Sequence, residues 1–270
     1  MTQSVLVISS SRPLGEPAAE VLRESGTLGL WEVSDRIWRA YFPFESESVA
    51  AALLRVDPEM SLLWETQEPV DWVQRYQESL RAIPAGRRFV ILPSPDLDNP
   101  FPGRMTLELV PGMAFGTGEH FTTASCLRNL EALSPVPSSV LDLGCGTGIL
   151  AAAAWKLGAR RVLACDIDPD ACAVSRETAR VNGTPFAVAL GSADVTDDRF
   201  ECVLANILGQ TLVELMPEIG SRVLPGGWLI GSGILLELGS DVLNAASLQG
   251  FRLAQQRTNG EWWTFLWRAK

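Results

Sequence analysis

The sequence predicts an α/β protein with two parts, a small N-terminal α+β domain and a larger domain built on an open, mostly parallel sheet. Two observations carry this prediction. Residues 1–66 read as strands and helices in the order βαββαβ, whereas the second half of the chain alternates strands with helices. Where that alternation begins, residues 139–168 read as a strand, a turn with three glycines, a helix and a second strand. This unit is typical of the start of a nucleotide-binding sheet.

The N-terminal elements fit a ferredoxin-like domain, in which two helices cover one face of an antiparallel sheet. We expect helices at residues 16–25 and 46–55, and strands at residues 4–9, 27–33, 36–42 and 60–65. The apolar side chains expected to form the core and the hydrophobic faces of this sheet are Val5, Val7, Trp31, Val33, Ile37 and Trp38. This region holds no cluster of His, Cys or paired carboxylates, so we expect residues 1–66 to bind rather than to catalyse.

A linker and two extended segments lead into the larger domain. Asp71 follows a proline and could cap a short helix, so we expect a linker helix at residues 67–80. The larger domain then takes residues 81–270. Its first extended segments are expected at residues 88–92 and 105–109, separated by a loop rich in Pro, Asp and Asn. A glycine-containing segment at residues 111–123, PGMAFGTGEHFTT, then precedes a helix through Cys126, Leu127, Leu130 and Leu133.

The turn with Gly144, Gly146 and Gly148 is the most informative stretch. Glycine allows a sharp turn, a close approach of ligand to backbone and close packing of helix on strand. The spacing is G-x-G-x-G, unlike the G-x-G-x-x-G of dinucleotide folds. Asp166 ends the next strand, about 20 residues past the glycines, where a carboxylate can accept both ribose hydroxyls of a nucleoside. The glycines alone would also fit a plain tight turn, but the whole unit indicates a nucleoside site.

The elements after Asp166 continue the alternation and bring more polar residues to strand ends. Asp194 follows a strand expected at residues 186–190, and Asn206 follows one expected at residues 200–205. The carboxyl ends of parallel strands meet at one edge, so the glycines, Asp166, Asp194 and Asn206 should converge there. Asp194 could reach an adenine amino group or could be a solvated surface residue. The other expected elements are helices at 169–181, 211–222 and through Val242, a turn at 224–227, and strands at 228–231, around Phe251 and at 262–267.

Composition narrows the class of protein and its partners. The 270 residues are 47% hydrophobic, without a run of about 18 apolar residues or a signal-peptide pattern at the N-terminus, so we expect a cytoplasmic globular protein. The five cysteines are odd in number and form no CxxC pair, which argues against both disulfides and a zinc site. A net charge of −10 argues against nucleic acid as a partner and favours a basic protein, and we expect no membrane partner.

The chain resembles the PrmA family, class I methyltransferases of the large-subunit ribosomal protein L11, in six segments: DWVQRYQES, GRRFVILP, PGMAFGTGEHFTT, VLDLGCGTGILAAAAWKLGA, DIDPDA and ANIL. The resemblance runs from about Asp71 onward, and FGTG-x-H-x-TT and ANIL set this family apart from other class I enzymes. It implies a Rossmann-like methyltransferase domain that transfers methyl groups from S-adenosylmethionine (AdoMet). The acceptors would be the α-amino group and lysine side chains of a protein that the small N-terminal domain recognises.

The resemblance implies that Thr123, Gly144, Asp166 and Asn206 contact AdoMet. Our candidate cofactor site also includes Gly146, Gly148, Asp194, Phe115 and Thr117, which belong to the glycine-rich turn, to the loop after a neighbouring strand and to the segment before the first helix. The last two lie in the segment that could fold over the ligand. The donor is already activated as a sulfonium, so no metal is needed.

Two residues are candidates for the chemistry. A neutral amine needs acceptors for its N–H groups, and the side-chain oxygen of Asn206 and the backbone carbonyl of Ile207 would serve. A purely structural Asn at a strand end is the alternative. His120 is the single histidine of the chain; it could shape the lid over AdoMet, pack in the loop, or act as a general base.

The sequence departs from the family pattern in one loop. Relatives usually have Thr-His-Pro after GTG, where this chain has Glu119-His120-Phe121, which removes a rigid proline and adds a carboxylate. The N-terminal domain has diverged as well. Two other functions therefore stay open: N-methylation of another protein or a small amine, and AdoMet binding by an inactive regulatory protein. We expect a monomer.

Overall fold

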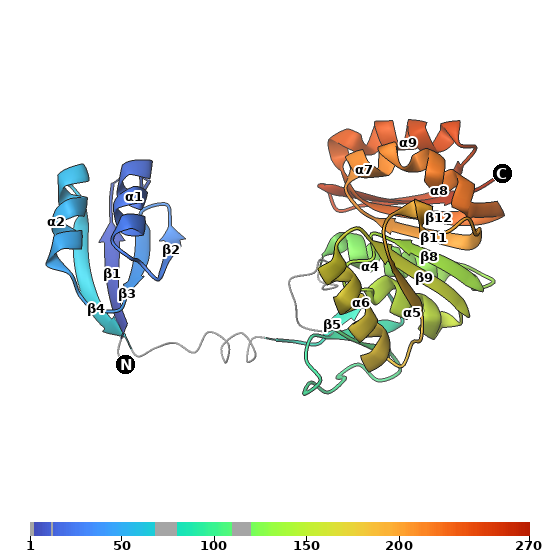
Figure 1. Ribbon diagram of the computed structural model, residues 1–270, viewed down its shortest axis with the longest axis horizontal. Coiled ribbons are helices and arrows are strands. Elements are labelled where there is room, and N and C mark those ends of the chain that lie inside the picture. Colours follow the sequence, from blue (N-terminus) through green and yellow to red (C-terminus); the bar gives the residue numbers. More distant parts are fainter. Residues whose placement is uncertain (1–2, 12, 68–79, 110–119) are drawn as a thin grey trace. The chain divides into compact units, whose positions relative to one another are not determined.

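The computed structural model describes residues 3–11, 13–67, 80–109 and 120–270. The chain divides into two compact units, Met1–Ser79 and Leu80–Lys270 (Figure 1). The expected linker helix falls almost wholly outside the described residues, and so do the predicted site residues Phe115 and Thr117.

The N-terminal unit has the predicted element order. It comprises β1 (Gln3–Ser9), α1 (Glu16–Glu24), β2 (Gly29–Ser34), β3 (Ile37–Phe42), α2 (Glu47–Val56) and β4 (Ser61–Gln67). Every strand pair is antiparallel and the sheet order is β2-β3-β1-β4, which is the ferredoxin-like arrangement. Its core forms where Leu22 of α1 and Leu53 of α2 pack with Leu6 and Ile8 of β1.

The apolar residues of this sheet are less buried than a core would require. Val5 and Trp38 are buried, and Val7 is half-buried. Trp31, Val33 and Ile37 are 52%, 49% and 38% exposed. The first two belong to β2, which lies at the edge of the sheet and is exposed along nearly its whole length. These three side chains therefore form an uncovered surface and not part of the core.

The second unit is built on a seven-stranded sheet in the order β10-β9-β8-β11-β12-β14-β13. Its strands are β8 (Ser139–Leu143), β9 (Arg161–Asp166), β10 (Ala187–Leu190), β11 (Phe200–Asn206), β12 (Val223–Leu235), β13 (Arg252–Thr258) and β14 (Trp262–Arg268). β14 runs antiparallel to both its neighbours, and the other pairs are parallel. The strand order reverses at β8, so the ligand crevice of such a sheet lies at the carboxyl ends of β8 and β11. The predicted Rossmann-like fold is confirmed.

Helices cover both faces of this sheet (Figure 1). One face packs against α4 (Phe121–Ala132), α5 (Ile149–Leu157) and α6 (Pro169–Val181), and the other against α7 (Gly209–Glu214), α8 (Met216–Arg222) and α9 (Gly239–Leu248). Short 3-10 turns span Ala193–Val195 and Leu236–Leu238. The alanines predicted to form a helix after the glycine-rich turn are all buried in α5, where their small side chains let the helix lie close to the sheet.

Three local features differ from the expectations. An additional strand, β5 (Ile83–Ala85), pairs with β6 (Phe89–Leu92), which in turn pairs with β7 (Met105–Glu108). The single helix expected at 211–222 is divided into α7 and α8, because Pro217 lacks an N–H and cannot continue α7. The expected turn at 224–227 is a bulge within β12: Phe200 pairs with Val223 and Cys202 pairs with Trp228.

Within the described residues, no helix has the length and apolar character needed to cross a membrane. All five cysteines are free and buried.

Candidate functional site

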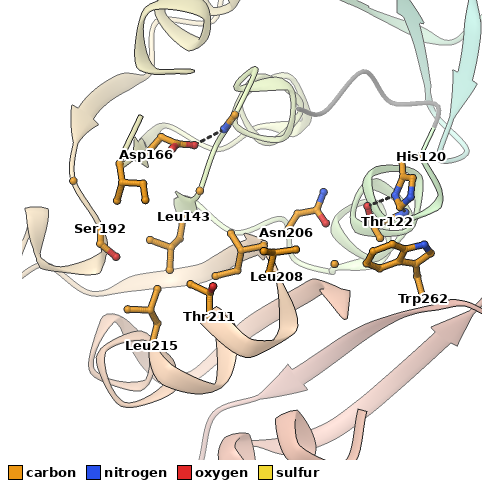
Figure 2. A pocket seen from close by; sticks show the side chains of 16 residues that line it. His120, Thr122, Leu143, Asp166, Ser192, Asn206, Leu208, Thr211, Leu215 and Trp262 are labelled. Atoms are coloured by element: carbon orange, nitrogen blue, oxygen red, sulfur yellow. Dashed lines mark hydrogen bonds between the residues drawn. The ribbon is translucent and has the colours of Figure 1, made fainter. Parts of the chain in front are cut away.

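A cavity of about 570 Å³ lies at the carboxyl edge of the seven-stranded sheet. Five of the predicted site residues line it: His120, Gly144, Gly146, Asp166 and Asn206. They come from four separate parts of the chain, at the start of α4 and at the ends of β8, β9 and β11. Figure 2 shows Asp166 toward one end of the cavity and His120 toward the other, with Asn206 between them.

The glycine-rich turn has a backbone that other residues rarely adopt. Gly144, Gly146 and Gly148 have φ values of 66°, 51° and 76°. A Cβ on Gly144 would collide with the side chain of Ile207, and one on Gly148 would collide with Ser175 of α6. Gly148 does not line the cavity; it precedes α5 and lets that helix pack against α6. The first two glycines therefore shape the cavity wall, while the third supports the packing behind it.

Asp166 connects the end of β9 to this turn. Its Oδ2 accepts a hydrogen bond from the backbone N–H of Gly146 at 2.9 Å, and its Oδ1 accepts one from the N–H of Asp168 at 3.1 Å. Each carboxylate oxygen can accept more than one hydrogen bond, so both retain capacity for a ligand. The two backbone bonds hold the carboxylate in place at the cavity wall before any ligand arrives.

Asn206 is the last residue of β11, and only one of its two side-chain amide atoms forms a hydrogen bond with a described residue. Its Nδ2 donates to Thr123 Oγ1 at 3.4 Å. Its Oδ1 is buried and has no hydrogen-bond partner among the described residues. Thr123 is itself buried and does not line the cavity, so its contact here is with Asn206. A buried acceptor without a partner costs about 1–3 kcal/mol, so this oxygen is a candidate to receive a hydrogen bond from a bound molecule.

His120 and Trp262 form an aromatic wall beside Asn206 (Figure 2). The two rings meet edge to face with centroids 5.2 Å apart. His120 also begins α4: its Nδ1 lies 2.8 Å from Thr122 Oγ1 and accepts the backbone N–H of Thr122 at 3.5 Å. The imidazole is therefore held by the helix on one side and by Trp262 of β14 on the other.

Asp194 lies outside the cavity lining. Its carboxylate is exposed and accepts the backbone N–H of Ser192 at 3.3 Å. Ser192 itself lines the cavity, so Asp194 shapes the loop next to it. Its contact with an adenine amino group stays a prediction, as do the cofactor contacts of the other candidate residues.

Sequence reasoning missed the apolar and late-chain parts of the lining. Ile167 and Leu208 line the cavity although they are 78% and 69% exposed. Each follows closely on a polar residue at a strand end, which is a signal that could have identified them. Gly233 and Trp262 also line the cavity, and no local motif marks either of them. Ile207, whose backbone carbonyl was expected beside the amine, lines the cavity as well. The other lining residues not predicted are Thr122, Leu143, Gly191, Ser192, Thr211 and Leu215.

Behind the turn lies a buried carboxyl, Asp142 of β8. Its Oδ2 accepts the backbone N–H of Ala151 at 3.0 Å, which ties the strand to the first turn of α5. The pKa of Asp142 is raised to about 7: burial is the largest cause, the Ala151 hydrogen bond opposes it, and the negative charge of Asp166 adds a smaller upward contribution. Asp142 thus supports the shape of the glycine-rich turn from within the fold.

The site has features that suit a nucleoside cofactor. A carboxylate is fixed at the end of β9, Gly144 and Gly146 line the cavity with backbone that carries no side chain, and the buried oxygen of Asn206 lacks a donor among the described residues. Within the described part of the chain, no group of three or more His, Cys, Asp or Glu residues is placed to hold a metal ion.

Comparisons with known proteins match this chain to one family. A family model described as ribosomal protein L11 methyltransferase (PrmA) matches residues 9–270. A protein of that name from Geobacter metallireducens is 46% identical over 200 residues, which cover 74% of this chain and 66% of the relative. Its counterpart from Geobacter sulfurreducens is 41% identical over 198 residues, which cover 73% and 66%. These matches span just under two thirds of each relative's length.

A solved structure gives the same result. The crystal structure of a ribosomal protein L11 methylase from Lactobacillus delbrueckii subsp. bulgaricus matches with a TM-score of 0.65 and 33% sequence identity. The match covers 70% of this chain and 100% of that one.

Proposed function

This chain belongs to the ribosomal protein L11 methyltransferase (PrmA) family, and we propose on that basis that it transfers methyl groups from AdoMet to the α-amino and lysine amino groups of ribosomal protein L11. The observation that carries the proposal is the buried Oδ1 of Asn206, which has no donor among the described residues and borders the cavity. An incoming amine has N–H groups to offer at that position.

The cofactor would bind along the glycine-rich turn. The carboxylate of Asp166 accepts the ribose hydroxyls, while Gly144 and Gly146 let the backbone come close to the methionine part. Leu143 and Ile167 offer apolar surface to the adenine ring. When bound, AdoMet supplies a methyl group that is already activated by the positive sulfur.

The residues around Asn206 would position the amine. Its Oδ1 and the backbone carbonyl of Ile207 accept the two N–H groups of the neutral amine, which directs the nitrogen lone pair at the methyl carbon. As the N–C bond forms, the S–C bond breaks and S-adenosylhomocysteine leaves. The substrate ammonium would release its proton to water before the transfer to give the neutral amine, so no dedicated base is required. His120 and Trp262 line the path with aromatic surface that suits the alkyl chain of a lysine.

The N-terminal unit would recognise the protein substrate. Residues 1–79 contain 13 acidic and 6 basic residues, a net charge of −7 within a total of −10. Such a unit attracts a basic protein and repels a phosphate backbone. Methylation of a ribosomal protein would take place in the cytoplasm, with the enzyme acting as a monomer.

Incubation with methyl-labelled AdoMet tests the proposal. Purified L11 and a total extract that contains small amines serve as parallel acceptors. The proposal expects label on L11, in its N-terminal residue and in lysines. Label confined to small molecules would assign the chain to another amine, and AdoMet binding without any transfer would make it a regulatory protein.

A further inference from the structure

Arg87, Arg128 and Arg257 form a cluster near the C-terminal end of α4, and none of them lines the cavity. The backbone N–H groups of Arg87 and Arg88 donate to the two carboxylate oxygens of Glu131 at 2.7 and 2.9 Å, which fixes the β5–β6 turn against the last turn of α4. Arg128 lies one turn earlier on the same helix. Arg257 of β13 also contacts α4, where its Nε donates to Asn129 Oδ1 at 3.0 Å.

The cluster of Arg87, Arg128 and Arg257 has more positive charge than its surroundings neutralise. Among the salt bridges of the described residues, none involves these three side chains. Burial lowers the pKa of Arg257, and the charges of Arg128 and Arg87 lower it further. The nearby Glu131 accepts two backbone hydrogen bonds and supplies one negative charge, fewer than the three positive charges of the cluster. Asn129, which is fully buried, leaves its Nδ2 without an acceptor in the described structure. The region therefore has a surplus of donors and cations.

The cluster lies close enough to the cavity for one bound protein to contact both. α4 begins beside His120, and Arg128 follows eight residues later, about 12 Å along a helix with a rise of 1.5 Å per residue. A protein partner typically buries about 800 Å² on each side, a patch with a radius of roughly 16 Å. A protein that places an amine next to His120 is thus wide enough to reach the cluster.

We propose that Arg87, Arg128 and Arg257 form a docking surface for an acidic segment of the protein substrate. This inference rests on the proposed function. Guanidinium groups form paired hydrogen bonds with carboxylates, and Arg87 and Arg128 are exposed to offer them. A long phosphate backbone fits less well, because the chain as a whole carries a charge of −10. The acidic N-terminal unit would attract basic parts of the substrate, and the arginine cluster would attract an acidic segment. Together these opposite charges would orient the substrate.

Charge reversal at Arg128 tests the docking surface, since this side chain is exposed and its replacement leaves the core untouched. Arg199→Glu is the matched control: it makes the same change of charge at another exposed arginine, immediately before β11. L11 binding is measured by calorimetry and L11 methylation by initial rates, at low and at high salt. AdoMet affinity is measured for each variant.

We expect Arg128→Glu to weaken L11 binding and raise KM for L11 about tenfold or more at low salt, with kcat and AdoMet affinity unchanged. High salt should narrow the difference from wild type. Arg199→Glu should behave as wild type. Equal effects of both variants, or no effect of Arg128→Glu, would overturn the inference while leaving the proposed function intact. Binding of a short RNA is measured in the same way, and a loss of RNA binding in Arg128→Glu without loss of L11 binding would overturn the inference as well. A wild-type enzyme that neither binds nor methylates L11 would instead refute the proposed function, and the inference with it.

Discussion

Replacing Gly233 with alanine should damage the amine site with little direct effect on the cofactor. Gly233 lies in β12 with a φ of 82°, and an added Cβ would collide with the carbonyl oxygen of Ile207 and lie 2.9 Å from its carbonyl carbon. That carbonyl is one of the two acceptors we assign to the substrate amine. The neighbouring peptide must move to admit the methyl group, and a displacement of about 1 Å can lower a rate about 100-fold.

The loss of unfolding free energy expected for Gly233→Ala has two contributions, which a second variant can separate. A left-handed backbone costs an alanine roughly 1–2 kcal/mol at any site, and forcing the packed peptide of Ile207 aside costs about 1–3 kcal/mol more. Gly103→Ala isolates the first part, because Gly103 has a φ of 83° and no atom within 4 Å of an added Cβ. We expect Gly103→Ala to lose about 1–2 kcal/mol of unfolding free energy and to keep full activity.

Urea unfolding and single-turnover methylation with saturating AdoMet make the comparison. Gly233→Ala should lose more stability than Gly103→Ala and should slow the methyl-transfer step about 100-fold. If the two variants lost equal stability and both reacted at the wild-type rate, the position of the Ile207 carbonyl would have no part in catalysis.

Three further predictions concern the cofactor, the buried carboxyl and the domain division. Asp166→Ala should weaken AdoMet binding by about 1.5–3 kcal/mol, because a charged acceptor for two hydroxyls is lost; unchanged affinity in calorimetry would remove Asp166 from the site. Asp142 has a pKa raised by burial to about 7 in the folded protein, so the folded state holds the proton more tightly and the free energy of unfolding should fall as pH rises from about 4 to about 7. Asp142→Asn should lack this part of the pH dependence, and parallel stability profiles of the two proteins between about pH 4 and 7 would contradict the assignment. Deletion of residues 1–66 should leave AdoMet binding nearly intact and abolish transfer to L11, whereas full activity of the shortened enzyme on L11 would show that the N-terminal unit does not recognise the substrate.

Local sequence signals predicted the helices whose ends are marked by capping residues, proline or glycine. The bounds of α6 match the expectation because Asp168 caps the helix, Pro169 starts it and Asn182 with Gly183 follows it. Asp166 and Asn206 were placed at the cavity because parallel strands bring their carboxyl ends to one edge, a rule that needs no knowledge of packing.

Residues that reach the site through long-range pairing had no such signal. Trp262 borders the cavity because β14 pairs antiparallel with β12, and the register places Trp262 opposite Leu235. Nothing in the sequence near Trp262 fixes that register. Likewise, the exposure of Trp31 depends on which face of the N-terminal sheet the helices cover and on the edge position of β2, both of which are set by the tertiary fold.

The most direct test of the account is the methyl-transfer rate of Asn206 variants. The account holds that the Oδ1 of Asn206, which lacks a partner in the described structure, accepts an N–H of the substrate amine. Single-turnover methylation of L11 by Asn206→Ala, with saturating AdoMet, should therefore be slower by about two orders of magnitude or more, with a smaller loss of AdoMet affinity. Asn206→Asp keeps an acceptor and should retain more activity than the alanine variant. A wild-type rate for Asn206→Ala would make Asn206 a structural strand end and would require the amine site to be placed elsewhere.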